Sequence, residues 1–210
     1  NTTAANNTFV GANAGLLNST GTGNTFMGKG AGDANTTAHD NTFIGTDAGG
    51  SNVTGTGNTF LGTAAGDVNT ASANTFLGAN AGGANTSAAD NTFIGTNAGL
   101  LNVTGVSNTF IGARAGDSNT ASGNTFIGKD AGGANTAGTL NTFIGSNSGA
   151  GNSTSTKNTF VGASSGQVNT GELNTFIGAN SGVANTGGDF NTFLGADAGM
   201  ELTITNHNTF

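Results

Sequence analysis

The triplet Asn-Thr-Phe recurs along almost the whole chain at a nearly constant interval, and this repetition constrains the fold more than any other feature. The triplets begin at residues 7, 24, 41, 58, 74, 91, 108, 124, 141, 158, 174, 191 and 208. Successive triplets are 16 or 17 residues apart, and the shorter steps begin at 58, 108 and 158, which gives a second period of 50 residues. We interpret this second period as duplication of a three-repeat block. Residues 1–210 are predicted to form a single repeat domain and, because they begin and end inside the repeat, a section of a longer fibre.

Each repeat has the same internal pattern. Counting from the Asn of the triplet, position 3 is Phe, position 4 is aliphatic, and positions 5 and 9 are Gly. Position 12 is Asn in every repeat except the last, which has Leu202 and loses the pattern. A short β-prone run bounded by Gly suits one coil of a β-solenoid, whereas two Gly residues per repeat would weaken a helix by up to about 1 kcal/mol each. We therefore predict an all-β, parallel β-solenoid of about twelve coils. Each coil should hold a strand at positions 1–5, a turn at 5–9, a second, more polar strand near 10–14, and a connector that absorbs the one-residue difference in length.

The composition supports an ordered but unusual core. Gly contributes 39 residues, Pro, Cys, Trp and Tyr are absent, and charged residues make up 7% of the chain. Because the apolar residues fall at fixed intervals, the bias indicates order and not a disordered segment. The net charge of −7 leaves no basic stripe for a nucleic acid partner, and no apolar run is long enough for a membrane span.

Stacked coils convert each repeat position into a column with a spacing of about 4.8 Å. We predict that the Phe column forms the core ladder. Asn at positions 1 and 12 should form ladders or cap turns, and Gly at position 5 should adopt backbone angles that other residues avoid. The predicted ladder consists of Phe9, Phe26, Phe43, Phe60, Phe76, Phe93, Phe110, Phe126, Phe143, Phe160, Phe176 and Phe193.

The residue after each Phe is also apolar, although neighbouring strand residues point to opposite faces. If Phe fills the coil, a column of aliphatic side chains is left outside and predicts an oligomer interface. The reverse assignment, with Phe at the oligomer axis, is the alternative. The predicted interface consists of Val10, Met27, Ile44, Leu61, Leu77, Ile94, Ile111, Ile127, Ile144, Val161, Ile177 and Leu194.

The pattern Asn-Thr-Phe-Ile-Gly-x-x-Ala-Gly-x-x-Asn-Thr resembles the head repeats of YadA-like trimeric autotransporter adhesins, and more closely the repeat arrays of phage tail-fibre and bacterial surface-fibre proteins. The resemblance covers residues 7–210. It implies a left-handed parallel β-roll within a homotrimer whose apolar strands face the three-fold axis. The adhesin heads have a shorter period, which indicates a different coil cross-section here.

No catalytic constellation is visible, because a repeat array presents the same residue many times instead of gathering unlike residues at one site. His39 and His207 lie in connectors of distant repeats, and the acidic residues form two sparse columns, at position 10 and at position 7. The calcium-binding nonapeptide pattern is missing. We therefore expect no enzyme activity, no cofactor and no metal. Sequons such as those at Asn18, Asn52, Asn102 and Asn152 are explained by the Asn- and Thr-rich composition.

These patterns predict a non-enzymatic structural or adhesive fibre segment, extracellular, on a cell surface or a virion, that meets a host-surface or glycan receptor. The alternative is an ice-binding solenoid. Thr at position 2 and the aliphatic residue at position 4 share one face of the strand, so a monomer would display flat columns similar to those of some solenoid antifreeze proteins.

Overall fold

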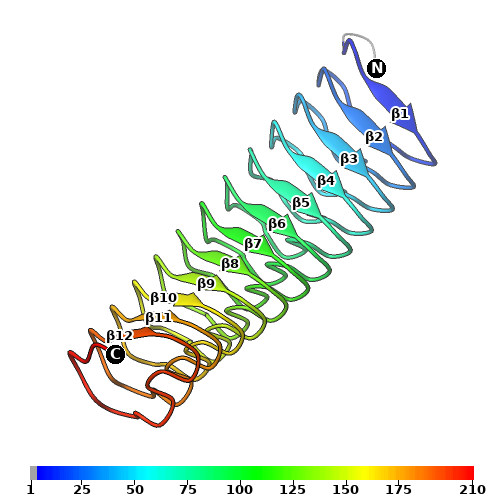
Figure 1. The fold of residues 1–210 in the computed structure, drawn as a ribbon. Helices are drawn as coiled ribbons and strands as arrows, with labels where there is room; N and C mark the ends of the chain where they lie inside the picture. Colours follow the sequence, from blue (N-terminus) through cyan, green and yellow to red (C-terminus); the bar gives the residue numbers. More distant parts are fainter. Residues whose placement is uncertain (1–3) are drawn as a thin grey trace. The chain divides into compact units, whose positions relative to one another are not determined.

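The computed structural model describes residues 4–210 and divides the chain into two compact units, one ending at Ser107 and the other formed by Asn108–Phe210. The described residues form no helix, and each unit contains six three-residue strands (Figure 1). The strands of the first unit are β1 (Thr8–Val10), β2 (Thr25–Met27), β3 (Thr42–Ile44), β4 (Thr59–Leu61), β5 (Thr75–Leu77) and β6 (Thr92–Ile94). Those of the second unit are β7 (Thr109–Ile111), β8 (Thr125–Ile127), β9 (Thr142–Ile144), β10 (Thr159–Val161), β11 (Thr175–Ile177) and β12 (Thr192–Leu194).

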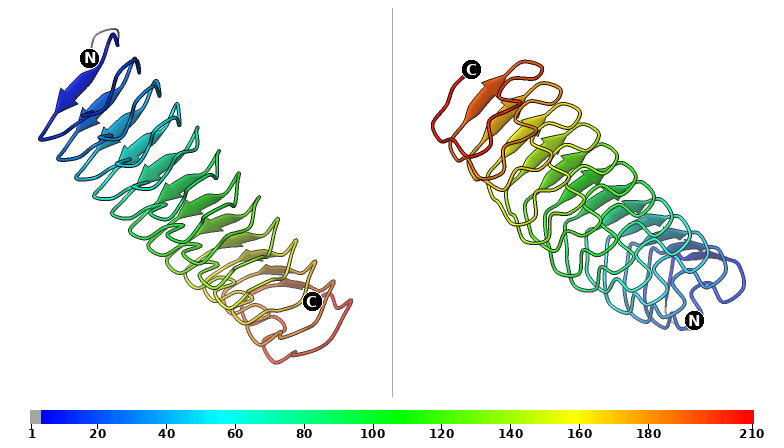
Figure 2. Two further views of the ribbon diagram at one scale, coloured as in Figure 1. Left: turned by 180° about the vertical axis from the view of Figure 1, so that it is seen from behind. Right: turned by 90° about the horizontal axis from the view of Figure 1, so that it is seen from below.

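Within each unit every strand pairs in parallel with the next, and like residues are in register. Phe9 lies opposite Phe26 in the first unit, for example, and Phe126 lies opposite Phe143 in the second. Figure 2 shows the coils of each unit stacked in chain order, one strand per coil. The predicted all-β parallel β-solenoid, with one coil per repeat, is therefore confirmed. The left-handed course and the trimer stay predictions.

The strand is shorter than predicted, and the predicted second strand at positions 10–14 is wrong. In the third coil the strand covers only Thr42–Ile44, and residues 45–52 form consecutive turns. Three N–H groups bond to carbonyls three residues earlier: Ala48 to Gly45, Gly50 to Asp47, and Asn52 to Gly49. Asp47 and Gly49 have φ angles of 55° and 58°, in the left-handed region. A run of turns cannot continue as a strand, although alternate N–H groups still bond to neighbouring coils.

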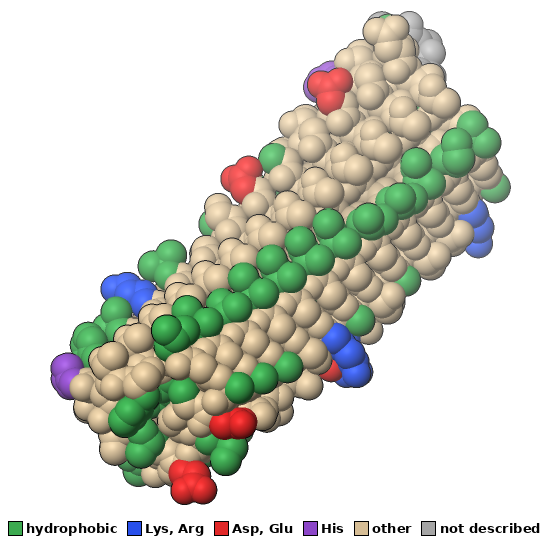
Figure 3. Space-filling view, in the orientation of Figure 1, with side chains coloured by type: hydrophobic (Ala, Val, Ile, Leu, Met, Phe, Trp, Pro, Cys, Tyr) green, Lys and Arg blue, Asp and Glu red, His purple; other side chains and the backbone are tan. Residues whose placement is uncertain are grey.

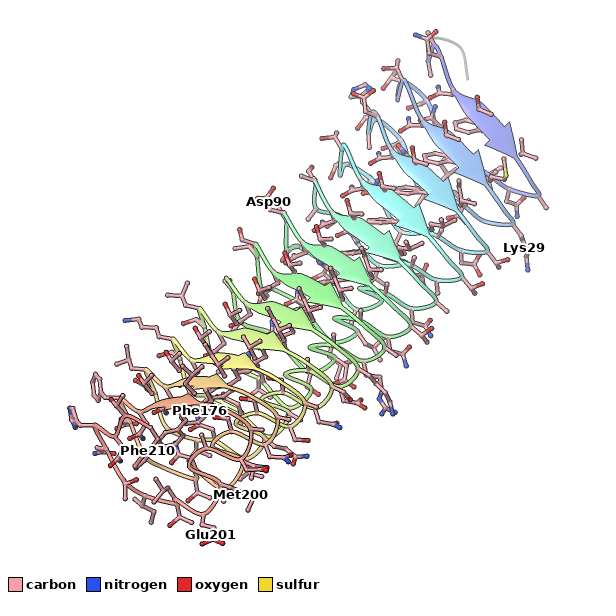
Figure 4. All side chains as sticks on the ribbon, in the orientation of Figure 1. Lys29, Asp90, Phe176, Met200, Glu201 and Phe210 are labelled. Carbon is pink, nitrogen blue, oxygen red and sulfur yellow. The ribbon has the colours of Figure 1, made fainter. Side chains whose placement is uncertain are left out.

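The Phe residues fill the coils. From Phe9 to Phe93 in the first unit and from Phe110 to Phe193 in the second, successive rings stack with centroids 4.7–5.0 Å apart and planes within 5–9° of parallel. From Phe26 to Phe193 the ladder residues are at most 1% exposed, and Phe176 can be followed inside its coil in Figure 4. Gly at position 9 is required beside the ring, because a Cβ at Gly49 would overlap Phe43.

Buried Asn residues connect the coils. The N–H of Asn41 donates to Oδ1 of Asn24 at 3.0 Å, and Nδ2 of Asn41 donates to the carbonyl of Gly55 at 2.8 Å. Asn52, at position 12, instead caps its own turn: its Nδ2 donates to the Gly55 carbonyl and its Oδ1 accepts from the Gly55 N–H. Both predicted roles of Asn are present, one between coils and one within a coil. Because a buried amide without partners is costly, this pattern accounts for the Asn at both positions.

The one-residue difference in repeat length lies directly after position 12. In the 17-residue repeat, Asn52 bonds to the carbonyl three residues later, at Gly55. In the 16-residue repeat, Asn69 bonds to the carbonyl two residues later, at Ala71. The shorter repeat therefore omits one residue between the cap and its acceptor, and its strand and core are unchanged.

Candidate contact surface

The aliphatic residues at position 4 lie on the outside of the coils. Phe at position 3 points inward, so its two strand neighbours, Thr and the aliphatic residue, point outward. Val10, Met27 and Leu194 are 53%, 44% and 66% exposed. The assignment with Phe inside therefore holds, and the reverse one is wrong for each unit. We call the outward position-4 residues the aliphatic column.

In the first unit the register of the strands aligns the aliphatic column as Val10, Met27, Ile44, Leu61, Leu77 and Ile94. In the second unit it is aligned as Ile111, Ile127, Ile144, Val161, Ile177 and Leu194. Figure 3 shows these side chains as a hydrophobic stripe over the strands, bordered by uncharged surface. Such a stripe is more apolar than the usual surface of a soluble monomer.

A column of Thr runs beside the aliphatic column. Thr42 and Ile44 lie on the same face of β3, and Thr59 and Leu61 on the same face of β4. Two residues along a strand span about 6.6 Å, and the stacked rings behind them repeat at 4.7–5.0 Å. The sheet face is thus a flat lattice of hydroxyl, methyl and methylene groups that carries no charge.

A further column lies at the residue just before each Asn-Thr-Phe triplet, and we call it the corner column. Its described members all have φ between 56° and 72°, in the left-handed region that non-Gly residues seldom adopt. Several corner residues donate their backbone N–H to a carbonyl of the preceding coil. The N–H of Phe190, for example, donates to the carbonyl of Glu172 at 3.1 Å. These hydrogen bonds hold the corner residues in the left-handed conformation. This column was not predicted from the sequence. Its only signal was the frequency of Gly, Asp and Asn before the triplets in the first half of the chain.

The corner column differs between the two units. In the first unit its members are Asn6, Gly23, Asp40, Gly57, Ala73, Asp90 and Ser107. In the second unit they are Gly123, Leu140, Lys157, Leu173, Phe190 and His207. Asn, Asp and Gly tolerate the left-handed region, whereas Leu and Phe are strained there. Leu140, Leu173 and Phe190 are nevertheless 59%, 41% and 50% exposed.

The acidic column at position 10 is partly buried. A Cβ placed on Gly50 would lie 2.7 Å from Oδ1 of Asp67 and 3.7 Å from Oδ1 of Asp33, so both carboxylates lean over this glycine. Burial, followed by the negative charges of Asp47 and Asp33, raises the pKa of Asp67. Burial also raises the pKa of Asp117, and the hydrogen bond from Ser118, followed by the charge of Arg114, acts in the opposite direction.

One ion pair crosses neighbouring coils at position 7. Nε of Arg114 donates to Oδ1 of Asp130 at 2.6 Å, and Nη2 of Arg114 donates to Oδ2 at 2.8 Å. Nζ of Lys129 lies 3.6 Å from the same Oδ2. The hydrogen bond from Arg114 lowers the pKa of Asp130. The pair lies at the surface, so we expect it to contribute little to the free energy of unfolding.

Each of the two His residues lies exposed on its own coil, His39 in the first unit and His207 in the second. Nδ1 of His39 accepts a hydrogen bond from the N–H of Thr22 at 3.0 Å, and the ring of His207 stacks on Phe190 with centroids 5.0 Å apart. Among residues 4–210, no three His, Cys, Asp or Glu side chains are grouped so that they could hold a metal ion, and no pocket is found. The described part of the chain also lacks a helix long and apolar enough to cross a membrane.

Four of the sequon Asn residues are inaccessible. Asn18 is 4% exposed, and Asn52, Asn102 and Asn152 are 0% exposed. All four occupy position 12, where the side chain turns into the coil. A glycan on any of these four would prevent its coil from closing.

Comparisons of the sequence with protein-family models and with curated proteins, and of the chain with solved structures, find no match.

Proposed function

We propose that this chain is a non-enzymatic structural and adhesive segment of an extracellular fibre, on a cell surface or a virion. The observation that carries the proposal is the use of one stacking plan in coil after coil, with a stacked Phe, a bonded Asn and an outward aliphatic residue each time. Such an array is stabilised by contacts between neighbouring coils and can be lengthened without a new core. It supplies reach and a repeated surface, as the resemblance to tail-fibre and surface-fibre repeats implies.

The partner that best fits the aliphatic column is two further copies of the chain. The column has the same register in coil after coil, and the surface beside it is uncharged, so identical columns can meet around an axis without burying a charge. Removing exposed Val, Leu, Ile and Met side chains from water stabilises an assembly by about 25 cal/mol per Å² of apolar area. The homotrimer would thereby cover the one continuous apolar strip of each unit's sheet face.

The test of the trimer is a pair of charged substitutions in the aliphatic column. Ile127→Asp and Ile144→Asp lie opposite each other in β8 and β9 and would place two carboxylates at the proposed axis. We expect the double variant to lose the trimer in sedimentation equilibrium. The matched control is Val168→Asp, which replaces a 44% exposed residue away from the strand and should leave the mass unchanged. An unchanged trimer in the double variant would contradict the proposed interface.

Receptor contact, in this proposal, belongs to the turns and corners that remain outside the trimer. These positions vary between repeats while the core positions do not, as in the pair Lys129 and Ser146 at position 6. The receptor would be a host-surface protein or glycan. Binding of the purified chain to a glycan array or to host cells tests this part, and no binding at any tested surface would leave the segment as a spacer only.

A second candidate function, ice binding, is favoured by the regular lattice of Thr and aliphatic side chains on the sheet face. Spacings of 4.7–5.0 Å between coils and about 6.6 Å along the strand give a flat and uncharged surface that can order water. This function requires a free sheet face and therefore a monomer. Thermal hysteresis that disappears in the variant Thr142→Lys would support it, whereas a stable trimer without thermal hysteresis would exclude it.

A further inference from the structure

The corner column of the second unit combines two unfavourable features that a purely structural role does not require. Leu140, Leu173 and Phe190 adopt φ angles of 59°, 57° and 56°, which are unfavourable for residues with a branched or bulky side chain. The same side chains are 41–59% exposed, so burial within the chain does not offset the strain. Strained and exposed apolar residues together indicate a surface selected for contact.

Charged side chains are interleaved with these apolar ones in a definite order. Lys157 is the corner residue of the coil between those of Leu140 and Leu173, and it is exposed. Glu172 and Asp189 directly precede Leu173 and Phe190 in the chain, and Glu172 is exposed. The column thus runs apolar, cationic, then apolar with adjoining acidic residues. Figure 3 shows this edge of the second unit as hydrophobic, basic and hydrophobic groups that end at a His.

We propose that this corner column is a lateral contact that binds a second copy of the same column in antiparallel orientation. A two-fold axis between the coils of Lys157 and Leu173 would place Leu140 opposite Phe190 of the second copy. It would also place Lys157 opposite Glu172 of the second copy, and the same pairs would form in reverse. The order of residues is therefore self-complementary, as a two-fold contact requires, and it matches unlike charges.

The proposed contact is small, so a single copy of it would bind weakly. Four coils at about 4.8 Å span about 14 Å, and a single column of that length is too short to bury the roughly 1,000 Å² expected of a stable interface. Two isolated copies would associate weakly. Fibres that carry several such corners would associate more strongly, because each contact raises the effective concentration of the next. The corner column would then bundle fibres side by side.

The inference is tested by sedimentation velocity of residues 1–210 over a range of concentrations. Whatever particle the aliphatic column produces, monomer or trimer, its mass should increase with concentration through the corner contact. A particle whose mass is constant up to millimolar chain concentration would overturn the inference and would leave the proposed trimer untouched. Concentration-dependent pairing of particles that are not trimers would contradict the proposed trimer and would support the corner contact.

Charge exchange tests the orientation of the contact. Lys157→Glu should weaken the association at least tenfold, since it places like charges opposite each other, and the double variant with Glu172→Lys should restore it. If Lys157→Glu has no effect, or if the double variant remains as weak, the antiparallel pairing is wrong. Asp90→Lys, at the corner of the first unit, is the matched control and should leave the association unchanged.

Substitution by Asn separates contact from stability. Asn tolerates the left-handed region, so Leu173→Asn and Phe190→Asn together should keep or raise the melting temperature while the association falls at least tenfold. A purely structural role predicts the opposite result, with a lower melting temperature and unchanged association. That outcome would overturn the inference.

Discussion

The two units have the same interior and different corners. In both units Phe rings stack at 4.7–5.0 Å, and buried Asn residues bond from coil to coil. At the corner, the first unit uses residues such as Asp40 and Asp90, which suit a positive φ, whereas the second unit uses Leu140 and Phe190, which do not. The interior that both units share therefore determines the coil, and the corner has a left-handed angle in both units whatever residue stands there. The side chain placed there is free to serve another purpose.

The largest effect is expected from the core, and it should be equal in the two units. Phe43→Ala and Phe143→Ala each remove a fully buried ring and should each lower the free energy of unfolding by about 3–5 kcal/mol. Urea denaturation measures both. If one variant cost several kcal/mol more than the other, the interiors would not be equivalent and the comparison would fail.

The next effect concerns the glycine at position 5, which is equally required in both units. Gly45 and Gly145 have φ angles of 140° and 131°, and a Cβ on either would overlap the carbonyl of the equivalent Gly in the next coil. Gly45→Ala and Gly145→Ala should each cost at least about 1–3 kcal/mol through backbone strain alone. The exposed Ala79→Ser is a suitable control for thermal denaturation. A melting temperature equal to that of the wild type in either Gly variant would contradict the described turn.

Exchanging the types of corner residue between the units should change the free energy of unfolding in opposite directions. Asp90→Leu in the first unit should destabilise the chain by about 1 kcal/mol, because Leu is strained at positive φ. Leu140→Asn in the second unit should stabilise it by a similar amount. Thermal denaturation at a chain concentration too low for lateral association compares the two. Equal signs would show that the corner residue is chosen for reasons other than backbone strain.

The smallest effect is expected in how the free energy of unfolding depends on pH, and it should have opposite signs at Asp67 and Asp130. The pKa of Asp67 is raised in the folded chain, so this carboxyl favours folding when it is protonated, and stability is lost as the pH rises through the folded-state pKa. The pKa of Asp130 is lowered, so its contribution is present at neutral pH and is lost as the pH falls through the folded-state pKa.

Denaturation of Asp67→Asn and Asp130→Asn at neutral and acidic pH measures this contrast. Relative to wild type, Asp67→Asn should be more stable at neutral pH than at acidic pH. Asp130→Asn should be less stable at neutral pH, and its deficit should shrink in acid. Parallel pH profiles for the two variants would contradict the assigned environments.

Much of the fold could be predicted because the same residues recur at the same positions of each repeat. Phe at position 3 and Gly at positions 5 and 9 recur so regularly that a stacked β-coil with an aromatic ladder followed from their spacing. The absence of a second strand could not be predicted, because the residues at positions 10–14 are compatible with either a strand or turns. The overlapping turn bonds from Gly45 to Asn52 depend on the left-handed angle at Asp47, which the residue type alone does not specify.

The candidate surface was predicted only in part. The aliphatic column followed from the two-fold alternation of a strand, and the structure places it outside because the ring of Phe43 and the side chain of Ile44 cannot share one face. The corner column was missed because Leu140, Leu173 and Phe190 look like ordinary apolar residues of a connector. Their significance depends on a positive φ, which the residue types do not specify.

The mass of the particle in solution tests most directly the proposal that the outward aliphatic column joins three copies of the chain. Sedimentation equilibrium at low protein concentration should give three times the chain mass of 20.2 kDa, and Ile127→Asp with Ile144→Asp should reduce it to one chain. A particle of one chain mass, with its aliphatic column stably exposed to water, would contradict the claim.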